Sequence, residues 1–202
     1  MGLNTGIFAK GYSQAHRHRH VSIAVCAGAS EALIIAPAKH RGDAMNVQQH
    51  SGFYVVGVAA RTHNAAEMNG TGKIGGIWHK LLQDNLAAKI PNKLGIDLVA
   101  VYTDYESDHR GEYTYLLGLP VSSIKDVPPR FVAKHIPGGR YSVVVSNRGP
   151  VAQVVPETWK RIWSMSPAEL GGVRSYRADY EIYDQRATDP ERAQIDVFVG
   201  LR

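Results

Sequence analysis

The sequence has very little cysteine and no long apolar run, and each scarcity excludes a class of protein. Cys26 is the single cysteine, so one copy of the chain holds neither a disulfide framework nor a multi-cysteine metal site. No segment approaches the roughly 20 apolar residues that a membrane-spanning helix needs. We therefore expect no membrane association, and a reducing cytoplasm fits the cysteine content.

Motifs for metal, cofactor and nucleotide chemistry are also missing. Six histidines lie outside the HRHRH cluster at 16–20, and none pairs at a ligand spacing such as i, i+4 on one helix. The chain has no GxSxG elbow, no P-loop and no GxGxxG segment that opens a helix. We expect no metal and no cofactor, and the sequence leaves open whether the protein is an enzyme.

The positive charge is concentrated near the start of the chain. The formal net charge is +5, but residues 1–44 hold five Lys or Arg against Glu31 and Asp43. The remaining 18 basic and 16 acidic residues nearly cancel. A folded part that is almost neutral lacks the basic footprint of a nucleic-acid-binding surface, so we expect no direct contact with nucleic acid.

Residues 1–44 differ in character from everything that follows. HRHRH (16–20) precedes a small, apolar stretch at 21–38. We interpret the segment as a disordered extension; a signal peptide or a metal-binding histidine cluster are the alternatives. Met45 is a plausible alternative start, and 45–202 is then the folded domain.

The same order of predicted elements, strand, helix, strand and strand, occurs twice in this domain. The first copy (53–121) has strand patterns at 53–62, 98–105 and 112–121 and a helical pattern at 74–89, whose apolar face includes Trp78. The second copy (130–202) has strand patterns at 130–145, 177–184 and 193–201 and a helical pattern at 155–165, whose apolar face includes Trp159 and Trp163. Pro156 is placed in the first turn of that helix. This order predicts an α+β fold with an antiparallel sheet and helices on one side.

Several segments of both copies resemble the GyrI-like effector-binding family. They are VYTDYESD, GEYTYLLG, GGRYSVVV, the W-x-x-I-W of the second helix, DYEIY and DPERAQIDVFVGL. The family includes drug-binding domains of transcription activators and stand-alone proteins, among them cationic-drug binders from integron cassettes. The resemblance covers about 47–202 and implies two copies related by a pseudo-two-fold axis with a ligand cleft between them. Residues 1–44 offer no helix-turn-helix pattern, so any regulatory partner would be a separate transcription regulator.

The resemblance implies that Glu181, in Y-E-x-Y, faces an aromatic pocket and neutralises a cation. Tyr183 shares a strand face with Glu181 by alternation, and aromatic faces attract cations. Core packing is the alternative for each aromatic candidate. The predicted ligand-binding residues are Glu181, Tyr183, Trp78, Trp163, Tyr102, Tyr115 and Phe198.

Three functions fit the sequence. The first is a binding domain for amphipathic, cationic small molecules, acting as a sensor or a sequestering protein. The second is a hydrolase of reactive small molecules in which Glu181 activates water. The third is a protein-interaction module of the gyrase-inhibitor type. We favour the first, because no second catalytic group is evident and the folded part does not mimic nucleic acid.

Overall fold

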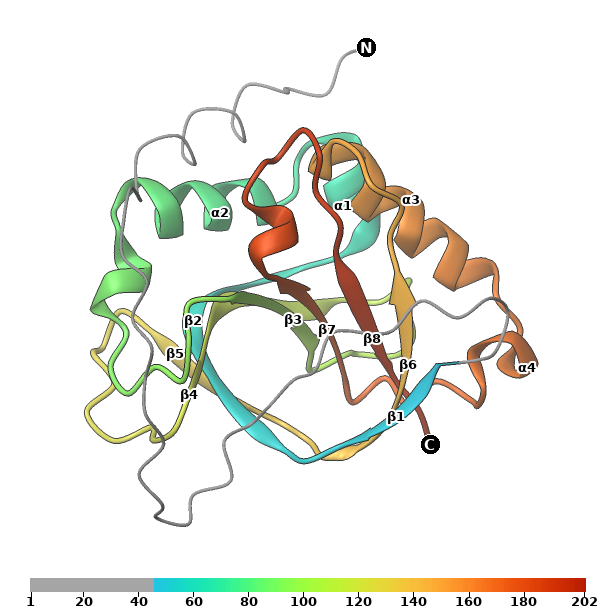
Figure 1. Cartoon of the computed structure of the whole chain (residues 1–202), viewed down its shortest axis with the longest axis horizontal. Helices are drawn as coiled ribbons and strands as arrows, with labels where there is room; N and C mark the ends of the chain where they lie inside the picture. Colours follow the sequence, from blue (N-terminus) through green and yellow to red (C-terminus); the bar gives the residue numbers. More distant parts are fainter. Residues whose placement is uncertain (1–45) are drawn as a thin grey trace.

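The computed structural model describes residues 46–202 as one curled antiparallel sheet with helices packed along its outer side (Figure 1). The expected extension (1–44) and the start at Met45 lie outside these residues. Eight strands run in the order β1-β6-β8-β7-β3-β4-β2-β5. The strands are β1 Val47–His50, β2 Phe53–Thr62, β3 Leu98–Thr103, β4 Tyr113–Val121, β5 Val132–Ile136, β6 Gly139–Val145, β7 Ala178–Tyr183 and β8 Asp196–Gly200.

Two helices, of 10 and 14 residues, cover most of the outer side of the sheet. These two are α2 and α3, which correspond to the helices predicted for the two copies. Among the described residues the helices are α1 Asn64–Asn69, α2 Ile74–Gln83, α3 Val151–Ser164 and α4 Pro167–Leu170, with 3₁₀ turns η1 Leu86–Lys89 and η2 Gln185–Ala187. No helix within this part of the chain is long and apolar enough to cross a membrane.

The strand order confirms the predicted duplication, but each copy has one strand more than predicted: β1 lies before the predicted start of the first copy, and the segment 130–145 forms two strands, β5 and β6. Exchanging β1, β2, β3 and β4 with β5, β6, β7 and β8 reproduces the same order read from the other end. The pseudo-two-fold axis therefore passes between the central strands β3 and β7, which pair antiparallel with Ala100 opposite Glu181. Residues near this pair are the ones to which both copies contribute.

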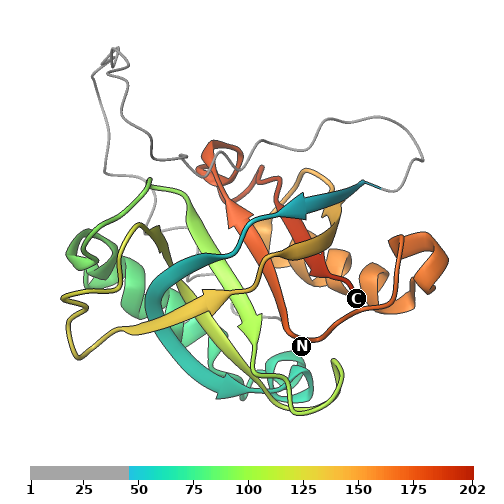
Figure 2. The ribbon, with the colours of Figure 1, turned by 90° about the horizontal axis from the view of Figure 1, so that it is seen from below.

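The two copies exchange their first strands. β1 pairs with β6 of the second copy, and β5 pairs with β2 of the first. Both pairings share one register, from Val47 opposite Ser142 to Gly57 opposite Val132, so they form one bent two-stranded ribbon (Figure 2). At the bend a Cβ on Gly138 would lie 2.8 Å from the Gly52 nitrogen, so the close approach requires glycine.

The curl of the sheet separates two apolar cores. The inner face buries Val101, Tyr180 and Phe198 with their neighbours. The outer face packs against the helices through residues such as Trp78, Leu81 and Trp159. Alternation along each strand sends successive side chains to opposite faces, so even a one-residue shift would exchange the two cores.

The structure differs from the prediction in the second helix. α3 begins at Val151, four residues before the predicted start, and Pro156 lies inside it rather than in its first turn. Three of its first five residues are valine, a β-branched residue that weakly disfavours helix and obscured its start, and proline cannot donate the backbone hydrogen bond expected within a helix. The helices α1 and α4 were not predicted, because segments of four to six residues show too little periodicity.

Candidate functional site

A cavity of about 490 Å³ lies between α2 and α3, above the central strands. Its walls are mainly aromatic and aliphatic, and both copies contribute to them, as predicted for a cleft between duplicated units. The lining residues are Asn64, Glu67, Met68, Ile74, Gly75, Trp78, Tyr102, Tyr105, His109, Tyr113, Tyr115, Val151, Ala152, Val155, Pro156, Trp159, Lys160, Trp163, Glu181 and Tyr183.

Glu181 lies on β7 at the inner end of this cavity and is fully buried, with 0% exposure. Its Oε1 accepts hydrogen bonds from the Tyr102 hydroxyl at 2.8 Å and from the Trp159 indole Nε1. Its Oε2 accepts one from the Tyr183 hydroxyl at 2.7 Å. A carboxylate offers about four acceptor positions, so Oε2 keeps capacity for a further donor or a charge.

Within residues 46–202, the groups that donate hydrogen bonds to Glu181 are all neutral. Burial raises the pKa of Glu181, and the hydrogen bonds from Trp159, Tyr183 and Tyr102 lower it in part. Among the described residues no Lys or Arg forms an ion pair with this carboxylate. An unpaired buried charge is costly, so this carboxylate can be stabilised either by taking up a proton or by a positive partner.

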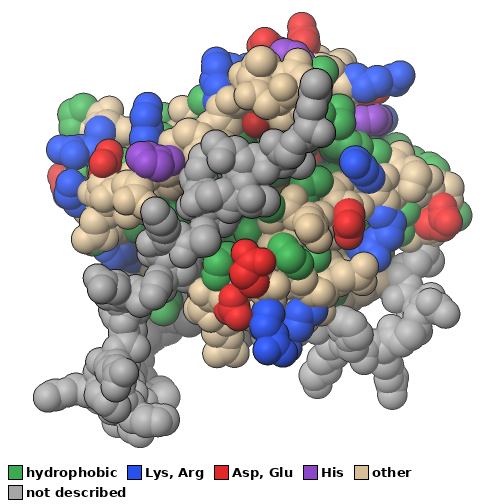
Figure 3. Space-filling model, turned by 90° about the horizontal axis from the view of Figure 1, so that it is seen from above, with side chains coloured by type: hydrophobic (Ala, Val, Ile, Leu, Met, Phe, Trp, Pro, Cys, Tyr) green, Lys and Arg blue, Asp and Glu red, His purple; other side chains and the backbone are tan. Residues whose placement is uncertain are grey.

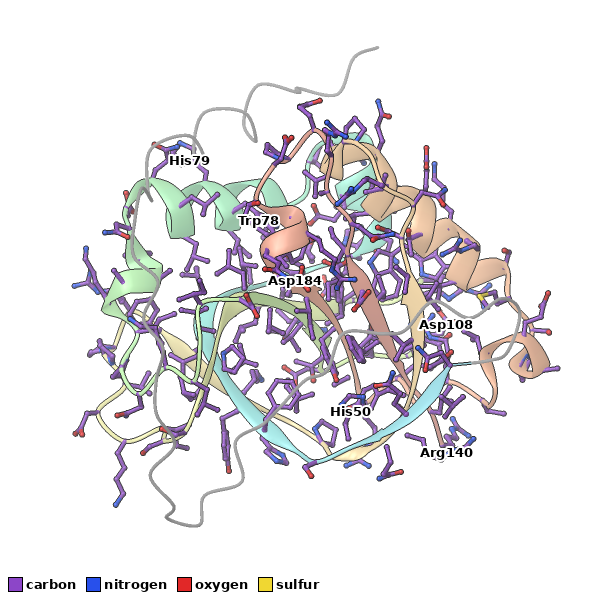
Figure 4. The ribbon with its side chains drawn as sticks, viewed as in Figure 1. His50, Trp78, His79, Asp108, Arg140 and Asp184 are labelled. Atoms are coloured by element: carbon purple, nitrogen blue, oxygen red, sulfur yellow. The ribbon has the colours of Figure 1, made fainter. Side chains whose placement is uncertain are left out.

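Aromatic side chains hold one another in place around Glu181. The Trp78 Nε1 donates to the Tyr115 hydroxyl at 2.9 Å, and the Trp78 ring meets the Tyr183 ring edge to face at 4.8 Å. The Tyr102 ring contacts Trp159 at 4.8 Å and Tyr115 at 5.2 Å. Figure 4 shows Trp78 pointing from α2 toward the sheet, whereas its neighbour His79 points away from it.

A buried ion pair contacts the network beneath Tyr105 and Trp159. Asp179 accepts from Arg174 at 2.6 Å and from the Tyr105 hydroxyl at 2.7 Å. The Arg174 guanidinium lies 5.9 Å from the centre of the Trp159 ring and 4.4 Å from that of Tyr176. This arrangement fixes two cavity walls from behind and keeps the charge of Arg174 paired with Asp179.

Another part of the cavity wall combines an aromatic stack with polar groups. His109, from the loop between β3 and β4, stacks on Trp163 with ring centres 5.4 Å apart. Burial lowers the pKa of His109, Asp108 opposes this shift, and Arg174 and Arg110 add to it. Its Nδ1 is buried without a hydrogen-bond partner. The lowered pKa favours the neutral form of His109, in which the ring presents an aromatic face to the cavity.

The short helix α1 brings a second carboxylate to the cavity. Glu67 accepts hydrogen bonds from the Thr62 hydroxyl and from the backbone N–H of Lys73 at 2.8 Å. One turn earlier, Asn64 accepts from the Tyr113 hydroxyl at 2.8 Å. The sequence pattern did not predict α1, which spans only six residues and buries none of them.

The structure brings six of the seven predicted site residues together and separates the seventh. Six line the cavity: Glu181, Tyr183, Trp78, Trp163, Tyr102 and Tyr115. Phe198 lies on the opposite face of the sheet, stacked on Tyr180 with ring centres 4.6 Å apart. It pairs with Tyr180, whose side chain alternates away from Glu181, so it belongs to the inner core.

Trp159 is the most important residue that the predicted site did not include. Both Trp159 and Trp163 stand on the apolar face of α3, four residues apart, but only Trp159 reaches Glu181. Their shared spacing gave no way to choose between them. Tyr113 was also left out of the site, although the alternation that places Tyr115 on this face applies equally to Tyr113.

Comparison with known families identifies the chain. Residues 47–201 match the Cass2 family, described as integron-associated effector binding protein. This protein belongs to the Cass2 family. The match spans both copies and every element that contributes to the cavity.

Individual proteins are similar to this Cass2 protein in sequence, in fold or in both. "Putative transcriptional regulator protein YobU" of Bacillus subtilis is 31% identical over 147 residues, which cover 72% of this chain and 90% of that protein. The integron cassette protein VCH_CASS2 from Vibrio cholerae is 28% identical, with a TM-score of 0.62 over 78% of this chain and 95% of that one. SAV2435, solved with tetraphenylphosphonium, shares the fold at 15% identity, with a TM-score of 0.64 over 79% of this chain and 94% of that one.

Proposed function

We propose that this Cass2-family protein binds amphipathic organic cations in the cavity between its two copies. The observation that carries the proposal is Glu181, a fully buried carboxylate surrounded by aromatic rings and held by three neutral donors. A cation there pairs with a charge that is poorly solvated in the empty protein. Aromatic faces add roughly 0.5–2 kcal/mol of cation–π attraction each.

The character of the walls favours a lipophilic ligand over a hydrated one. Apart from three charged side chains, the lining consists of aromatic, aliphatic and small polar residues. Such a surface stabilises an organic ammonium or phosphonium ion, whose charge is spread and weakly hydrated, better than it stabilises a metal ion. The tetraphenylphosphonium bound to SAV2435 is a ligand of this chemical class on the same fold.

The arrangement supports binding more than hydrolysis. Both oxygens of Glu181 already accept hydrogen bonds from neutral donors, and this suits a fixed countercharge. A general base needs an oxygen that reaches a water beside the substrate. The side chains that contact the carboxylate through hydrogen bonds are Tyr102, Trp159 and Tyr183, so the described residues supply no second acid or base beside Glu181.

The biological role that follows is ligand sensing or sequestration in the cytoplasm, together with a separate transcription regulator. Its support is the effector-binding family and the regulator name of the 31% identical relative. Figure 3 shows basic and acidic side chains mixed over the described part of the helix-side surface, which suits a small-molecule binder better than a DNA-binding protein.

The test compares ligands of the same shape and different charge. Phenyltrimethylammonium, neutral tert-butylbenzene and anionic phenylphosphonate are titrated by calorimetry into the wild type and Glu181→Gln. We expect the cation to bind the wild type best and to lose about 5- to 150-fold in the variant, the range for a charged hydrogen-bond partner. Glu157→Gln removes a charge from an exposed position of α3 and is the control. Equal affinity for the three ligands, or an unchanged cation affinity in Glu181→Gln, would refute the proposal.

A further inference from the structure

We propose that the cavity is built for dications, with Glu67 as the second anionic position. This inference rests on the proposed function and extends it from one positive charge to two. The cavity wall includes three side chains with a formal charge, namely Glu67, Lys160 and Glu181. Lys160 is exposed and pairs with neither carboxylate, so a monocation paired with Glu181 leaves Glu67 with hydrogen-bond donors but without a cationic partner among the described residues.

The two carboxylates lie on either side of a group of tyrosines. Tyr102 donates to Glu181 and its ring lies 5.5 Å from Tyr113, which in turn donates to Asn64 on α1. Glu67 follows Asn64 by one helical turn on the same side of α1, and both line the cavity. A chain of contacts across the aromatic floor thus connects the two acidic positions.

Both carboxylates raise the pKa of the tyrosines that lie between them. Burial raises the pKa of Tyr113, and Glu67 and then Glu181 raise it further. The pKa of Tyr115 is raised by burial, then by Glu181, and to a smaller extent by Glu67. Both negative charges therefore act on the same part of the cavity, where a ligand with two separated positive groups would be stabilised at each end.

The hydrogen bonds of Glu67 leave one of its oxygens available. Oε1 accepts from Thr62 and from the Lys73 N–H, whereas Oε2 accepts only a long bond, 3.3 Å, from the Ile74 N–H. Among the described residues no Lys or Arg pairs with Glu67. The backbone donors at the start of α2 hold the carboxylate, and Oε2 remains to meet a cationic group.

The helix that carries Glu67 is lightly packed against the rest of the domain. α1 spans six residues and buries none of them, and it ends at Gly70, which adopts φ of +82°. Glu181, by contrast, is fixed by three hydrogen bonds on a central strand. One charge position is therefore rigid and the other is carried by a lightly packed element, which suits a family of dications rather than one spacing.

The experiment uses bis(trimethylammonium)alkanes of increasing chain length and the alkyltrimethylammonium ions of the same lengths. Each pair is titrated by calorimetry into the wild type, Glu67→Gln, Glu181→Gln and the control Glu157→Gln. Gln retains a carbonyl oxygen for the donors around Glu67. We expect Glu67→Gln to weaken the best dication about 10-fold and the matched monocation less than about twofold. Glu181→Gln is expected to weaken both.

A second variant leaves the hydrogen bonds of Glu67 intact. Met68 lines the cavity and is 60% exposed, so Met68→Lys adds a positive charge at this end with little effect on packing. We expect it to weaken the dication more than the monocation. Equal losses for both ligands in Glu67→Gln and Met68→Lys, or no preference of the wild type for any dication, would overturn the inference. Failure of the monocation itself to depend on Glu181 would instead overturn the proposed function.

Discussion

Two adjacent glycines in α2 allow the cavity assignment to be tested with a matched pair of substitutions. A Cβ at Gly75 or at Gly76 would meet no atom within 4 Å, and neither residue has a positive φ. Only Gly75 lines the cavity. Alanine at either position should stabilise the helix by about 1 kcal/mol. For a domain of this size we expect each Ala variant to raise Tm by about 2–4 °C in a thermal melt.

Leucine at the same positions separates the two sites. A leucine side chain at Gly75 occupies space otherwise filled by a ligand group of similar size, which forfeits about 1.5–3 kcal/mol of apolar burial. Binding of phenyltrimethylammonium should therefore weaken by about 10- to 150-fold in Gly75→Leu and stay unchanged in Gly76→Leu, as measured by calorimetry. If both variants bound like the wild type, or both lost affinity equally, the ligand would lie elsewhere.

Four further predictions concern ionisation and the ribbon. Burial raises the pKa of Glu181 above its usual 4.5, so ionisation of this group destabilises the empty fold. The Tm of Glu181→Gln should therefore exceed that of the wild type by a margin that grows as pH rises above about 4.5. A cation that pairs with the ionised carboxylate releases the proton of Glu181 to the buffer. Cation affinity should therefore rise over the same pH range, and a pH-independent affinity would contradict this. Trp159→Phe removes one donor to the carboxylate, raises its pKa further and should move the affinity profile to higher pH, which calorimetry at several pH values measures. Gly138→Ala places a Cβ 2.8 Å from the Gly52 nitrogen and should lower the free energy of unfolding by about 1–3 kcal/mol, measured by denaturant unfolding. An unchanged free energy of unfolding would show that the backbone of the ribbon shifts to accommodate the methyl group.

The sequence was sufficient for the duplicated pattern but not for the pairing of distant strands. Alternation and turn signals located β2, β3, β4, β7 and β8 and both main helices, because these are local properties. The exchange of β1 and β5 depends on contacts between segments about 75 to 95 residues apart, which no local pattern records. The same limit explains why β1 was not recognised as part of the second half of the sheet.

The candidate site was predictable where it depends on alternation within one strand. Tyr183 was placed beside Glu181 on that basis, and the two are hydrogen-bonded. Phe198 required the register between β7 and β8, which sets it opposite Tyr180 rather than on the cavity face. Glu67 required α1 to fold back over the tyrosines, and a six-residue helix with no buried residue has no apolar period to reveal it.

The bent two-stranded ribbon, in which β1 pairs with β6 and β2 with β5, affects the order in which the chain folds during synthesis. β2 lacks one neighbour until β5 has emerged, and β1 has no partner at all until β6 has emerged. A nascent chain that ends within the first copy therefore carries two unpaired strand edges, which are the surfaces through which partly folded chains associate. Translation must proceed past residue 145 before β6 can close the pairing, and such long-range closure is intrinsically slow. Fragments 46–126 and 127–202, expressed together, should each supply the strand that the other lacks.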